Sequence, residues 1–549
     1  MTTRVRPDIP RAKRDGLDLD LAAVCAAGPG ALRAEDHYRL KTYGVCPQRH
    51  DDRFMVRLRV AGGILDHVQT SAIATAAHEL AGGWVHLTTR QNVELHSIAL
   101  EDVPALYARL APAGVVGRSA CGHTIRNVLA CPEAATSAEE PFDVSADARW
   151  LSSQLVARSR ELNVALPNRL NISLGGCTQC GLEALTNDIG LVACVQDGEP
   201  GYQLWAGGSL GTAPRLSLML RPFLPRPELW PAVWSIVEWF LTEGDVEQVT
   251  KGRLKFLIDA RGESAFRAAF TKRFASMRVE NTLEPPPIAL TPSDDLVRTL
   301  AQAPALGWRH TVRPERRAGY ASITVRVPLG DLRADDLVAL TELAPAGRIV
   351  LTRDQDVLVP SVPVDDVSRV VGELGARDLG PEGARGAADV RACPGLSFCS
   401  LAITGSQPVA MAIERAMNVR QDLPRDVVIS VSGCPNSCTK QQVADIGLSG
   451  TKVKVAGTVG LGYQLWLGAD LPGGMVGEPV LRLTEHEVPQ AVVATAELWV
   501  ALRRPGETPG ATFRRTGLDV VGDALEVRLR EFGFGERPVV ADDALAGAA

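Results

Sequence analysis

The stretch NISLGGCTQC at residues 171–180 recurs in altered form as VISVSGCPNSC at residues 428–438. In both places two further shared blocks follow, NDIGLVA and GYQLWAGGSLG in the first copy and ADIGLSG and GYQLWLGADL in the second. The blocks keep their order, so that Asp188 of the first copy corresponds to Asp445 of the second. Solenoid repeats recur every 20–50 residues or so, and this much longer period therefore indicates a duplicated domain.

The duplication continues upstream of these blocks. LTTRQNVEL (87–95) corresponds to LTRDQDVLV (351–359), and SACGHTIRN (119–127) takes the place of RACPGLSFC (391–399). Several blocks that match in the same order are an improbable coincidence. We therefore expect two halves of common origin that differ by small loop changes.

Each half has the hydrophobic pattern of a strand–helix–strand unit. FMVRLRVAGG (54–63) alternates like a strand, SAIATAAHELAG (71–82) is typical of a helix closed by glycine, and WVHLTTRQNVELHSI (84–98) returns as strands. The second half repeats this pattern over residues 320–330, 334–347 and 348–362. Such a unit is half of a ferredoxin-like layer, and two of them can join into one small domain.

The sequence therefore predicts an α+β protein in which two ferredoxin-like half-domains are joined with two larger α+β domains. A chain of 549 residues is too long for a single hydrophobic core. Segments rich in Pro or Gly near 283–296 and 379–388 are the expected connections. The predicted parts are an N-terminal extension at 1–48, half-domains at 49–116 and 300–378, larger domains at 117–285 and 386–505, and a C-terminal tail at 506–549.

Composition and charge limit the class of protein. Apolar residues make up 46% of the chain, and the net charge of -6 gives no electrostatic reason to expect nucleic acid as a partner. No apolar run is long enough for a transmembrane helix, and the charged first residues do not resemble a secretory signal. The 11 cysteines, an odd number, argue against a disulfide framework. We expect a cytoplasmic protein that binds neither nucleic acid nor a membrane.

Four cysteines carry the clearest chemical signal, in the pairs Cys393-x5-Cys399 and Cys434-x3-Cys438. Four thiolates suit a [4Fe–4S] cluster, because each iron takes one soft ligand. Zinc prefers more closely spaced pairs, so the first spacing argues against it, and four buried free cysteines are the remaining alternative. Turn formers between the cysteines, such as Asn436, let the backbone wrap tightly and direct N–H groups toward sulfur.

The blocks ACPGLSFC and SGCPNSC, with TTRQNVELH and RNVLACP upstream, resemble those of the sirohaem- and [4Fe–4S]-dependent ferredoxin–nitrite and sulfite reductases. The resemblance covers roughly residues 40–500 and includes both repeats. It implies a duplicated nitrite/sulfite reductase fold, with sirohaem between the halves and a small oxyanion bound on the open face of the sirohaem. It also implies that Cys438 bridges the cluster to the sirohaem iron.

The resemblance assigns anion binding and catalysis to the first half. Arg90 in TTRQ and Arg126 in IRNV match the family's two anion-binding arginines, and a guanidinium suits bidentate contact with an oxyanion or a carboxylate. In LPNRLNI, Arg169 and Asn171 match a further pair. Asn171 resembles the nitrite-reducing branch, whereas the sulfite branch usually has Lys. Arg169 departs from both branches, in which Lys is expected, and arginine cannot give up its proton near neutral pH.

The two copies show a division of labour in this alignment. The position of Arg90 holds Asp354 in the second copy, and the position of Cys399 holds Asn127 in the first. The first half thus kept basic residues and the second half kept the cluster. The residues expected to bind the cofactors are Gln91, His96, Asn127, Gly207, Gly208, Gln355, Asn436 and Cys438, the two glycines because they permit close approach to a flat cofactor.

Some residues depart from the family's pattern. Glu94 stands where relatives usually have Gln, and a carboxylate there would repel the sirohaem carboxylates unless it is paired or protonated. Cys46 stands where many relatives have Tyr, and the sequence assigns it no role. Cys177 and Cys180 form a C-x2-C pair that we interpret as the remnant of an ancestral cluster site. The alternative, a second metal site, would need Cys121 and Cys131 as partners.

No G-x-G-x-x-G motif opens a strand–turn–helix unit, so electrons must come from a separate carrier, and the resemblance implies reduced ferredoxin. We predict the six-electron reduction of nitrite to ammonia. Alternatives are the reduction of sulfite to sulfide by the same framework, and a specialised paralogue that reduces an organic nitrogen-oxide or sulfur substrate. A further hypothesis is a cluster protein without sirohaem that only transfers electrons, but such a carrier has no need of anion-binding arginines.

Overall fold

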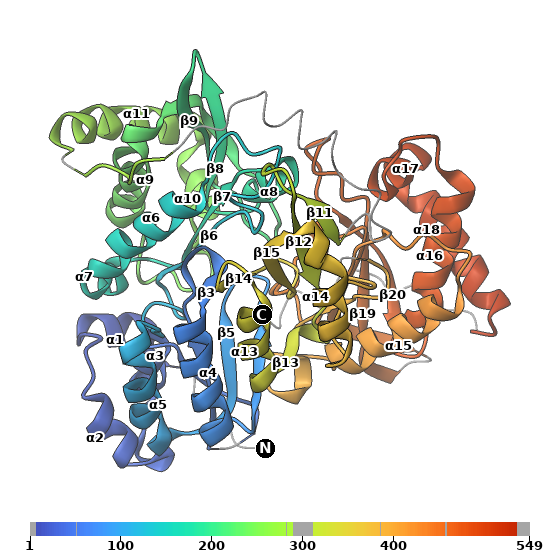
Figure 1. The fold of residues 1–549 in the computed structure, drawn as a ribbon, viewed down its shortest axis with the longest axis horizontal. Helices are drawn as coiled ribbons and strands as arrows, with labels where there is room; N and C mark the ends of the chain where they lie inside the picture. The colour runs from blue at the N-terminus through green and yellow to red at the C-terminus, as the bar shows by residue number, and fades with distance from the viewer. Residues whose placement is uncertain are drawn as a thin grey trace. The chain divides into compact units, whose positions relative to one another are not determined.

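The computed structural model of the chain describes residues 7–50, 52–281, 283–288, 311–384, 386–455 and 458–534. The chain divides into two compact units, Met1–Leu210 with Pro214–Ala384 and Gly211–Ala213 with Arg385–Ala549. The first unit holds both ferredoxin-like half-domains and the larger domain of the first copy, and the second unit holds the larger domain of the second copy (Figure 1). The predicted start of the second half-domain at residue 300, part of the 283–296 connection and the end of the predicted tail lie outside the described residues.

Two five-stranded sheets form the ferredoxin-like part, and each sheet includes one strand from the other copy. The first sheet has the order β1-β2-β5-β4-β13 and the second the order β11-β12-β15-β14-β3. The strands of the first sheet are β1 Val45–Pro47, β2 Arg53–Leu58, β5 Val93–Ala99, β4 Trp84–Leu87 and β13 Asp331–Arg333. Those of the second sheet are β11 Val312–Pro314, β12 Tyr320–Val325, β15 Val357–Pro363, β14 Arg348–Leu351 and β3 Ile64–Asp66.

The exchanged strands β3 and β13 are short and pair antiparallel. Leu332 of β13 lies opposite Val85 of β4, and Leu65 of β3 lies opposite Ile349 of β14. Each exchanged strand leads directly into a helix of its own copy, which is α4 (His67–Leu80) after β3 and α13 (Ala334–Leu343) after β13. The two half-domains therefore complete each other's sheets.

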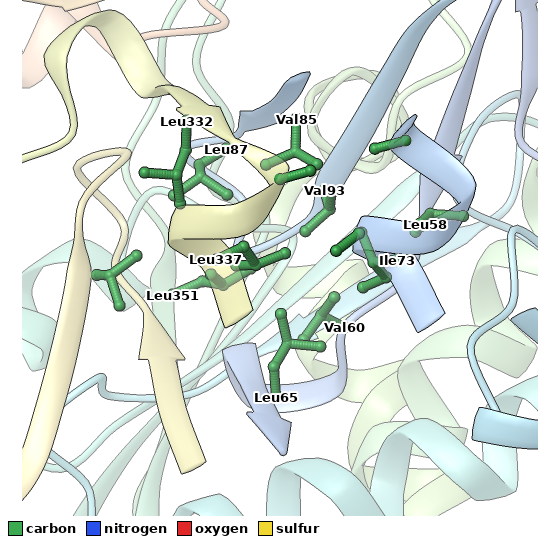
Figure 2. Packing of buried hydrophobic residues seen from close by; sticks show 14 of the residues in the cluster. Leu58, Val60, Leu65, Ile73, Val85, Leu87, Val93, Leu332, Leu337 and Leu351 are labelled. Carbon is green, nitrogen blue, oxygen red and sulfur yellow. The ribbon is translucent and has the colours of Figure 1, made fainter. Parts of the chain in front are cut away.

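One hydrophobic core runs through both half-domains. Helix α4 packs against α13 and against α5 (Val103–Leu110), while α14 (Val367–Gly375) follows β15 in the second copy. Figure 2 shows buried side chains of both copies packed together, namely Leu58, Val60, Leu65, Ile73, Val85, Leu87 and Val93 from the first and Leu332, Leu337 and Leu351 from the second. Burial of each such side chain contributes about 1.5–3 kcal/mol, so separation of the copies would expose the centre of one core.

Two buried glutamines form hydrogen bonds between the two half-domains. Gln91 donates from Nε2 to the carbonyl of Leu351 at 2.8 Å and accepts at Oε1 from the N–H of Ala130 at 3.0 Å. Gln355, its counterpart in the second copy, donates to the carbonyl of Leu87 at 3.1 Å. The two side chains therefore bridge the copies reciprocally. These contacts favour a structural role for two residues that the family resemblance places at a cofactor.

The larger domain of the first copy is built on a mixed sheet of order β10-β9-β8-β7-β6. Strands β6 (Ile125–Leu129), β7 (Leu170–Gly175) and β8 (Ile189–Gln196) run parallel, and β9 (Glu199–Ala206) and β10 (Leu218–Pro225) continue antiparallel. Its helices are α6 Ser145–Ala157, α7 Ser159–Ala165, α8 Thr178–Ala184, α9 Leu229–Glu243, α10 Leu254–Arg261 and α11 Glu263–Glu280. Helices α9 and α11 pack together, and Trp239 contacts Phe266 with ring centroids 4.7 Å apart.

The larger domain of the second copy repeats this sheet with the order β16-β17-β18-β19-β20. The strands are β16 Arg391–Ala392, β17 Ile429–Ser432, β18 Ile446–Val455, β19 Thr458–Leu467 and β20 Glu478–Thr484. The helices are α15 Ser406–Val419, α16 Val488–Leu502, α17 Pro509–Thr516 and α18 Leu518–Glu531. As in the first copy, the first three strands are parallel and the rest antiparallel.

The two ends of the chain are more structured than their sequences indicated. The expected N-terminal extension contains α1 (Ile9–Arg14), α2 (Leu21–Ala26) and α3 (Ala34–Thr42), and α1 packs against α3. In the expected C-terminal tail, α17 and α18 are folded helices, and α18 packs against α16 and buries Val521, Leu525 and Leu529. None of the described helices combines the length and the apolar character needed to cross a membrane.

Strand register corrects one part of the sequence alignment. In the second copy Arg391 pairs with Ser430, and Cys393 follows two residues after Arg391. In the first copy Leu129 pairs with Ser173, the counterpart of Ser430. The residue that corresponds to Cys393 is therefore Cys131, two residues after Leu129.

The equivalence of Asn127 with Cys399 is accordingly wrong. The blocks SACGHTIRN and RACPGLSFC share an Ala-Cys pair, which produced a false match. The Ala-Cys-Pro of the first copy stands ten residues further on, at 130–132, directly after β6. The first copy thus kept a cysteine at the position of Cys393.

We expect Gln91→Ala to lower the free energy of unfolding by about 2–4 kcal/mol, because it opens a cavity and leaves a buried carbonyl and a buried N–H unpaired. Chemical denaturation followed by circular dichroism measures the change. Gln196→Ala, on the exposed end of β8, is the control and should change the stability by less than about 0.5 kcal/mol. Equal effects of the two substitutions would contradict the bridging role.

Candidate active site

The four cysteines predicted to hold iron lie in two loops of the second unit. Cys393 and Cys399 belong to the loop after β16, and Cys434 and Cys438 to the loop after β17. Since β16 and β17 are parallel neighbours, their C-terminal ends meet at one edge of the sheet. None of the four forms a disulfide, and Cys438 is exposed whereas Cys393 and Cys434 are buried.

Main-chain N–H groups are directed at these sulfur atoms. Gly433 donates to Sγ of Cys393 at 3.2 Å, and Leu401 donates to Sγ of Cys399 at 3.4 Å. Hydrogen bonds of this kind stabilise a thiolate and adjust the reduction potential of an iron–sulfur cluster. The two loops therefore provide the donors that a cluster-binding set requires.

The thiols also affect one another electrostatically. Burial, together with the charges of Cys393 and Cys399, raises the pKa of Cys434 to about 11, although hydrogen bonds from the main chain and side chain of Asn436 act in the opposite direction. Within the described residues, no three of the four cluster cysteines have all their sulfur atoms within 4.8 Å of one another. Neighbouring thiols at this wider spacing suit a cluster, in which each thiolate binds a different iron, better than a single ion.

The first unit gathers basic side chains from separate segments. Arg90 follows β4, Arg126 lies on β6, Arg169 precedes β7, and Arg253 and Lys255 lie at the start of α10. The positive charges of Arg253, Arg126 and Arg90, together with burial, lower the pKa of Arg169 well below its usual range. The fold thus brings together Arg90, Arg126 and Arg169, which separate sequence motifs had identified.

Among the described residues, two guanidinium groups of this cluster, those of Arg126 and Arg169, have N–H groups without an acceptor. Arg126 donates to the carbonyls of Ala120 and Gly122 at 2.7–3.3 Å through three of its five N–H groups, and two remain. Among the described residues, no hydrogen-bond acceptor binds the Arg169 guanidinium. A half-buried cation that is surrounded by other cations and lacks an acceptor among the described residues is the arrangement expected of an anion site.

Sequence motifs did not identify Arg253 or Lys255. Arg253 donates to both carboxylate oxygens of Asp188 at 3.0 and 2.8 Å, and Asp188 also accepts from the N–H of Asn171 at 2.8 Å. The pair fixes Arg253 beside the strand that carries Asn171. Burial and the charge of Arg253 lower the pKa of Lys255 to about 8. The repeated Asp188 was visible in the sequence, but its partner is 65 residues away and no spacing rule connects the two.

Buried polar atoms without hydrogen-bond partners occur on the same segments. They are Oδ1 of Asn127, Oδ1 of Asn171 and Nε of Arg253. Folded proteins rarely leave such atoms unpaired, so a bound group is the usual explanation. Nε of Arg253 is a donor that a cofactor carboxylate or a small anion can accept from, whereas the two amide oxygens accept and need a donor such as water.

Glu94 is paired, as its position requires. Arg57 donates from Nε to Oε1 of Glu94 at 2.7 Å, and Nε2 of His96 lies 3.4 Å from Oε2. Despite burial, the Arg57 charge lowers the pKa of Glu94, so this carboxylate stays ionised. His96 also forms a 2.7 Å hydrogen bond between Nδ1 and Nε2 of Gln48. The predicted cofactor role of His96 remains a prediction.

Cys46, to which the sequence assigned no role, lies against Cys121. The two thiols are hydrogen-bonded, and Arg57 donates to Sγ of Cys121 at 3.1 Å. The hydrogen bond from Cys46 and the charges of Arg57 and Arg126 lower the pKa of Cys121 to about 6. Cys121 therefore belongs to the surroundings of the cationic cluster and not to the C-x2-C pair.

The two glycines predicted to approach a cofactor are tightly packed within their own domain. A Cβ on Gly207 would lie 2.7 Å from Cδ1 of Ile258, and one on Gly208 would lie 2.2 Å from the carbonyl oxygen of Leu185. Gly207 also has a φ of +87°. Protein packing alone thus requires glycine at both positions, and contact with a cofactor remains a prediction.

The second copy keeps the carboxylate of Asp188 but not its cation. Asp445 accepts from the N–H of Val428 at 2.9 Å, as Asp188 does from Asn171. Burial raises the pKa of Asp445 to about 6, and the charge of Arg391 only partly opposes this effect. The equivalent aspartate therefore supports a cationic site in one copy, whereas in the other it forms no hydrogen bond to an arginine side chain among the described residues.

Thiols with amide donors in one unit, and buried cations with unpaired polar atoms in the other, define a redox enzyme that acts on a small anion. The profile "Nitrite and sulphite reductase 4Fe-4S domain" matches residues 121–277 and 383–531. The profile "Nitrite/Sulfite reductase ferredoxin-like half domain" matches residues 47–113 and 313–377. These matches cover more than half of the chain, and the chain belongs to the nitrite and sulfite reductase family, whose cofactors are a [4Fe–4S] cluster and sirohaem.

Named relatives include enzymes for both anions. A ferredoxin–nitrite reductase of Synechococcus elongatus is 30% identical over 434 residues, which are 76% of this chain and 80% of the relative. An assimilatory ferredoxin-dependent nitrite reductase of Haloferax mediterranei is 29% identical over 89% of this chain and 86% of the relative. The ferredoxin sulfite reductase 2 of Mycolicibacterium paratuberculosis is 28% identical, with 83% and 80% covered.

A solved structure has the same fold. The NirA protein of Mycobacterium tuberculosis superposes with a TM-score of 0.78 over 94% of this chain and 96% of that chain, at 24% sequence identity. The match confirms the predicted α+β fold with its ferredoxin-like half-domains.

We expect Asp445→Asn to stabilise the protein more at pH 7.5 than at pH 4. The pKa of Asp445 is about 4 in the unfolded wild-type chain and about 6 in the folded protein. As the pH rises from 4 to 6, the unfolded chain loses this proton while the folded protein keeps it, and the free energy of unfolding of the wild type falls. Asparagine keeps the acceptor for Val428 and does not titrate. The difference between variant and wild type should grow by about 2–3 kcal/mol across the window and then level off.

Melting temperatures of both proteins across this pH range measure the effect. Gln421→Ala, at an exposed position that carries no titratable group, is the control and should show no such trend. A variant whose advantage is the same at pH 4 and pH 7.5 would mean that burial does not perturb Asp445.

Proposed function

We propose that this chain reduces nitrite to ammonia with six electrons from ferredoxin. The observation that carries the proposal is the guanidinium of Arg169, which lies among Arg90, Arg126 and Arg253 and has no acceptor in the described part of the chain. A small oxyanion supplies both the acceptor and the negative charge that this position lacks. The named nitrite reductases among the relatives, and Asn171 at the position that resembles the nitrite branch, support nitrite as that anion.

The chain's own residues bind the anion, orient it and neutralise its charge. When bound, sirohaem supplies the iron at which the anion is reduced, and the cluster supplies electrons one at a time. Cys393, Cys399, Cys434 and Cys438 are the residues that would hold the cluster. Arg90, Arg126 and Arg169 orient the anion through charge-assisted hydrogen bonds and stabilise negative charge on the oxygens as they leave. Arg253, fixed by Asp188, keeps the local charge positive.

Protons must reach the same place as the electrons. Nitrite gives ammonium and two water molecules by taking up six electrons and eight protons. The arginines stay protonated near neutral pH and cannot donate. Lys255 is buried beside Arg253 and Arg169, and its pKa of about 8 permits proton transfer near neutrality. We assign proton donation to Lys255, in the place of the lysine that the family carries at position 169.

Sulfite is the second candidate substrate. The surplus of positive charge around Arg169 favours a doubly charged anion, and one of the named relatives is a sulfite reductase. Ferredoxin as donor follows from the names of the relatives and from the lack of a nucleotide-binding motif. A cytoplasmic location is part of the proposal, because a reducing compartment keeps the 11 free thiols reduced.

The test is turnover of nitrite and sulfite side by side with reduced ferredoxin. We expect nitrite to have the higher kcat/KM, and Arg169→Gln to lower it by about 10–100-fold because one or two charge-assisted hydrogen bonds are lost. Arg169→Lys, which keeps the charge, is the matched variant and should retain most of the activity. Wild-type protein that contains sirohaem but turns over neither anion would refute the function.

We expect Asn171→Lys to shift the ratio of kcat/KM values toward sulfite. A further cation beside Arg169 attracts a dianion more strongly than a monoanion. Asn171→Gln, a neutral change of similar length, is the control and should leave the ratio within about twofold. The ratio, and not either rate alone, is the measurement, since both variants can lose activity through poor packing. An unchanged ratio in the lysine variant removes Asn171 as a determinant of specificity.

A further inference from the structure

Three cysteines of the first unit form a buried cluster apart from the predicted iron site. Their sulfur atoms, on Cys131, Cys177 and Cys180, all lie within 4.8 Å of one another, and Sγ of Cys131 is 3.4 Å from Sγ of Cys177. All three residues are buried and all three are free thiols. Within the described part of the chain, this is the sole group of three or more His, Cys, Asp or Glu side chains with metal-ligand spacing.

The cluster occupies the place that the [4Fe–4S] site has in the second copy. Cys131 follows β6 as Cys393 follows β16, and Cys177 follows β7 as Cys434 follows β17. The third thiol breaks the correspondence, since Cys180 stands one residue before the position equivalent to Cys438. The partner that sequence reasoning left open for the C-x2-C pair is therefore Cys131.

The sulfur spacing distinguishes a single ion from a cluster. A zinc ion with bonds of about 2.3 Å to tetrahedral thiolates holds its sulfur atoms about 3.8 Å apart, which lies within the spacing found here. An iron–sulfur cluster binds each thiolate at a different corner and needs the sulfur atoms further apart. The three thiols are thus drawn too closely together for a cluster and suit one thiophilic ion.

Arg353 organises the three segments that carry these cysteines. From its buried guanidinium it donates to the carbonyls of Ala130 at 3.3 Å, Leu174 at 2.8 Å and Cys180 at 3.2 Å. Ala130 immediately precedes Cys131, and Leu174 lies three residues before Cys177 in the sequence. Outer contacts of this kind fix the orientation of metal ligands. Three thiolates with one Zn²⁺ carry a single negative charge, and the Arg353 cation, which also pairs with Glu183 at 3.9 Å, lies beside them.

One small hollow touches the cluster at Cys131. A hollow lined by Gly62, Cys131, Pro132 and Arg348 reaches this cysteine. Neither Cys177 nor Cys180 lines this hollow, so it meets the cluster at Cys131 alone.

We propose that Cys131, Cys177 and Cys180 bind one Zn²⁺ ion, with water as the fourth ligand. On binding, the three thiols release their protons to solvent and each sulfur forms a bond to zinc. The ion ties the end of β6 to the start of α8 after β7, and these two strands carry Arg126 and Asn171. The site thereby positions the strands of the cationic cluster, and its existence does not depend on which anion the enzyme reduces.

Metal analysis of the intact protein tests the proposal. Protein produced in zinc-supplemented medium and purified anaerobically should contain about one zinc per chain in addition to its iron. A mercurial thiol reagent should release that zinc, and a chromogenic chelator measures the release. Absence of zinc under these conditions overturns the proposal. So does copper in its place, iron in excess of the cluster and sirohaem, or a mass lower by two hydrogens, which indicates a disulfide.

Variants locate the ion. Cys177→Ser and Cys180→Ser should each lower the zinc content by more than about tenfold, while the iron content and the sirohaem absorption remain. Cys194→Ser, on β8 of the same domain and outside the cluster, is the matched control and should keep its zinc. If a serine variant fails to fold, the zinc content of the wild-type protein still decides. Zinc that persists in both folded serine variants overturns the assignment.

Discussion

The exchange of β3 and β13 between the two copies is the constraint on which the rest of the structure depends. Each ferredoxin-like sheet is finished by a strand of the other copy, and the side chains at the crossing form one core. The loops next to this crossing are therefore held firmly. One of them carries Arg90 of the cationic cluster, and its counterpart in the second copy carries Arg353, which clamps the three-thiol cluster. The packing of this one core thus positions both Arg90 of the cationic cluster and Arg353 beside the three thiols.

Duplication gave both copies the same sheet, and the chemistry diverged at the ends of the same strands. After β16 and β17 the cysteines are spaced for a cluster, whereas after β6 and β7 they are drawn together. The shared aspartate shows the same divergence. Asp188 holds Arg253 and so supports a cationic site, whereas Asp445 has no such bidentate partner and its pKa rises. Local charge, and not backbone topology, therefore separates the functions of the two copies.

The sequence predicted what repeats or follows a local pattern. The duplication, the α+β class and the ferredoxin-like halves followed from matching blocks and hydrophobic period, and they were confirmed by the family profiles and by the fold. Contacts between residues that lie far apart in the chain could not be predicted from the sequence. Arg253 and Asp188 are far apart in the sequence and come into contact only in the folded protein. The strand exchange does not change the order of helices and strands along the chain, so the sequence pattern does not reveal it. The Ala-Cys dipeptide that ends at Cys121 resembles the one that ends at Cys393, and the two were therefore aligned. The strand register shows that the counterpart of Cys393 is Cys131.

The strand exchange also governs the order in which a growing chain can fold. The first sheet lacks its last strand until residues 331–333 have left the ribosome, so for much of synthesis β4 has an unpaired edge. Unpaired edges of this kind recruit other strands and promote aggregation. The edge of β4 therefore stays open to pairing with other strands until more than half of the protein has been made. Gene duplication thus produced an enzyme whose older fold can no longer be completed by one copy alone.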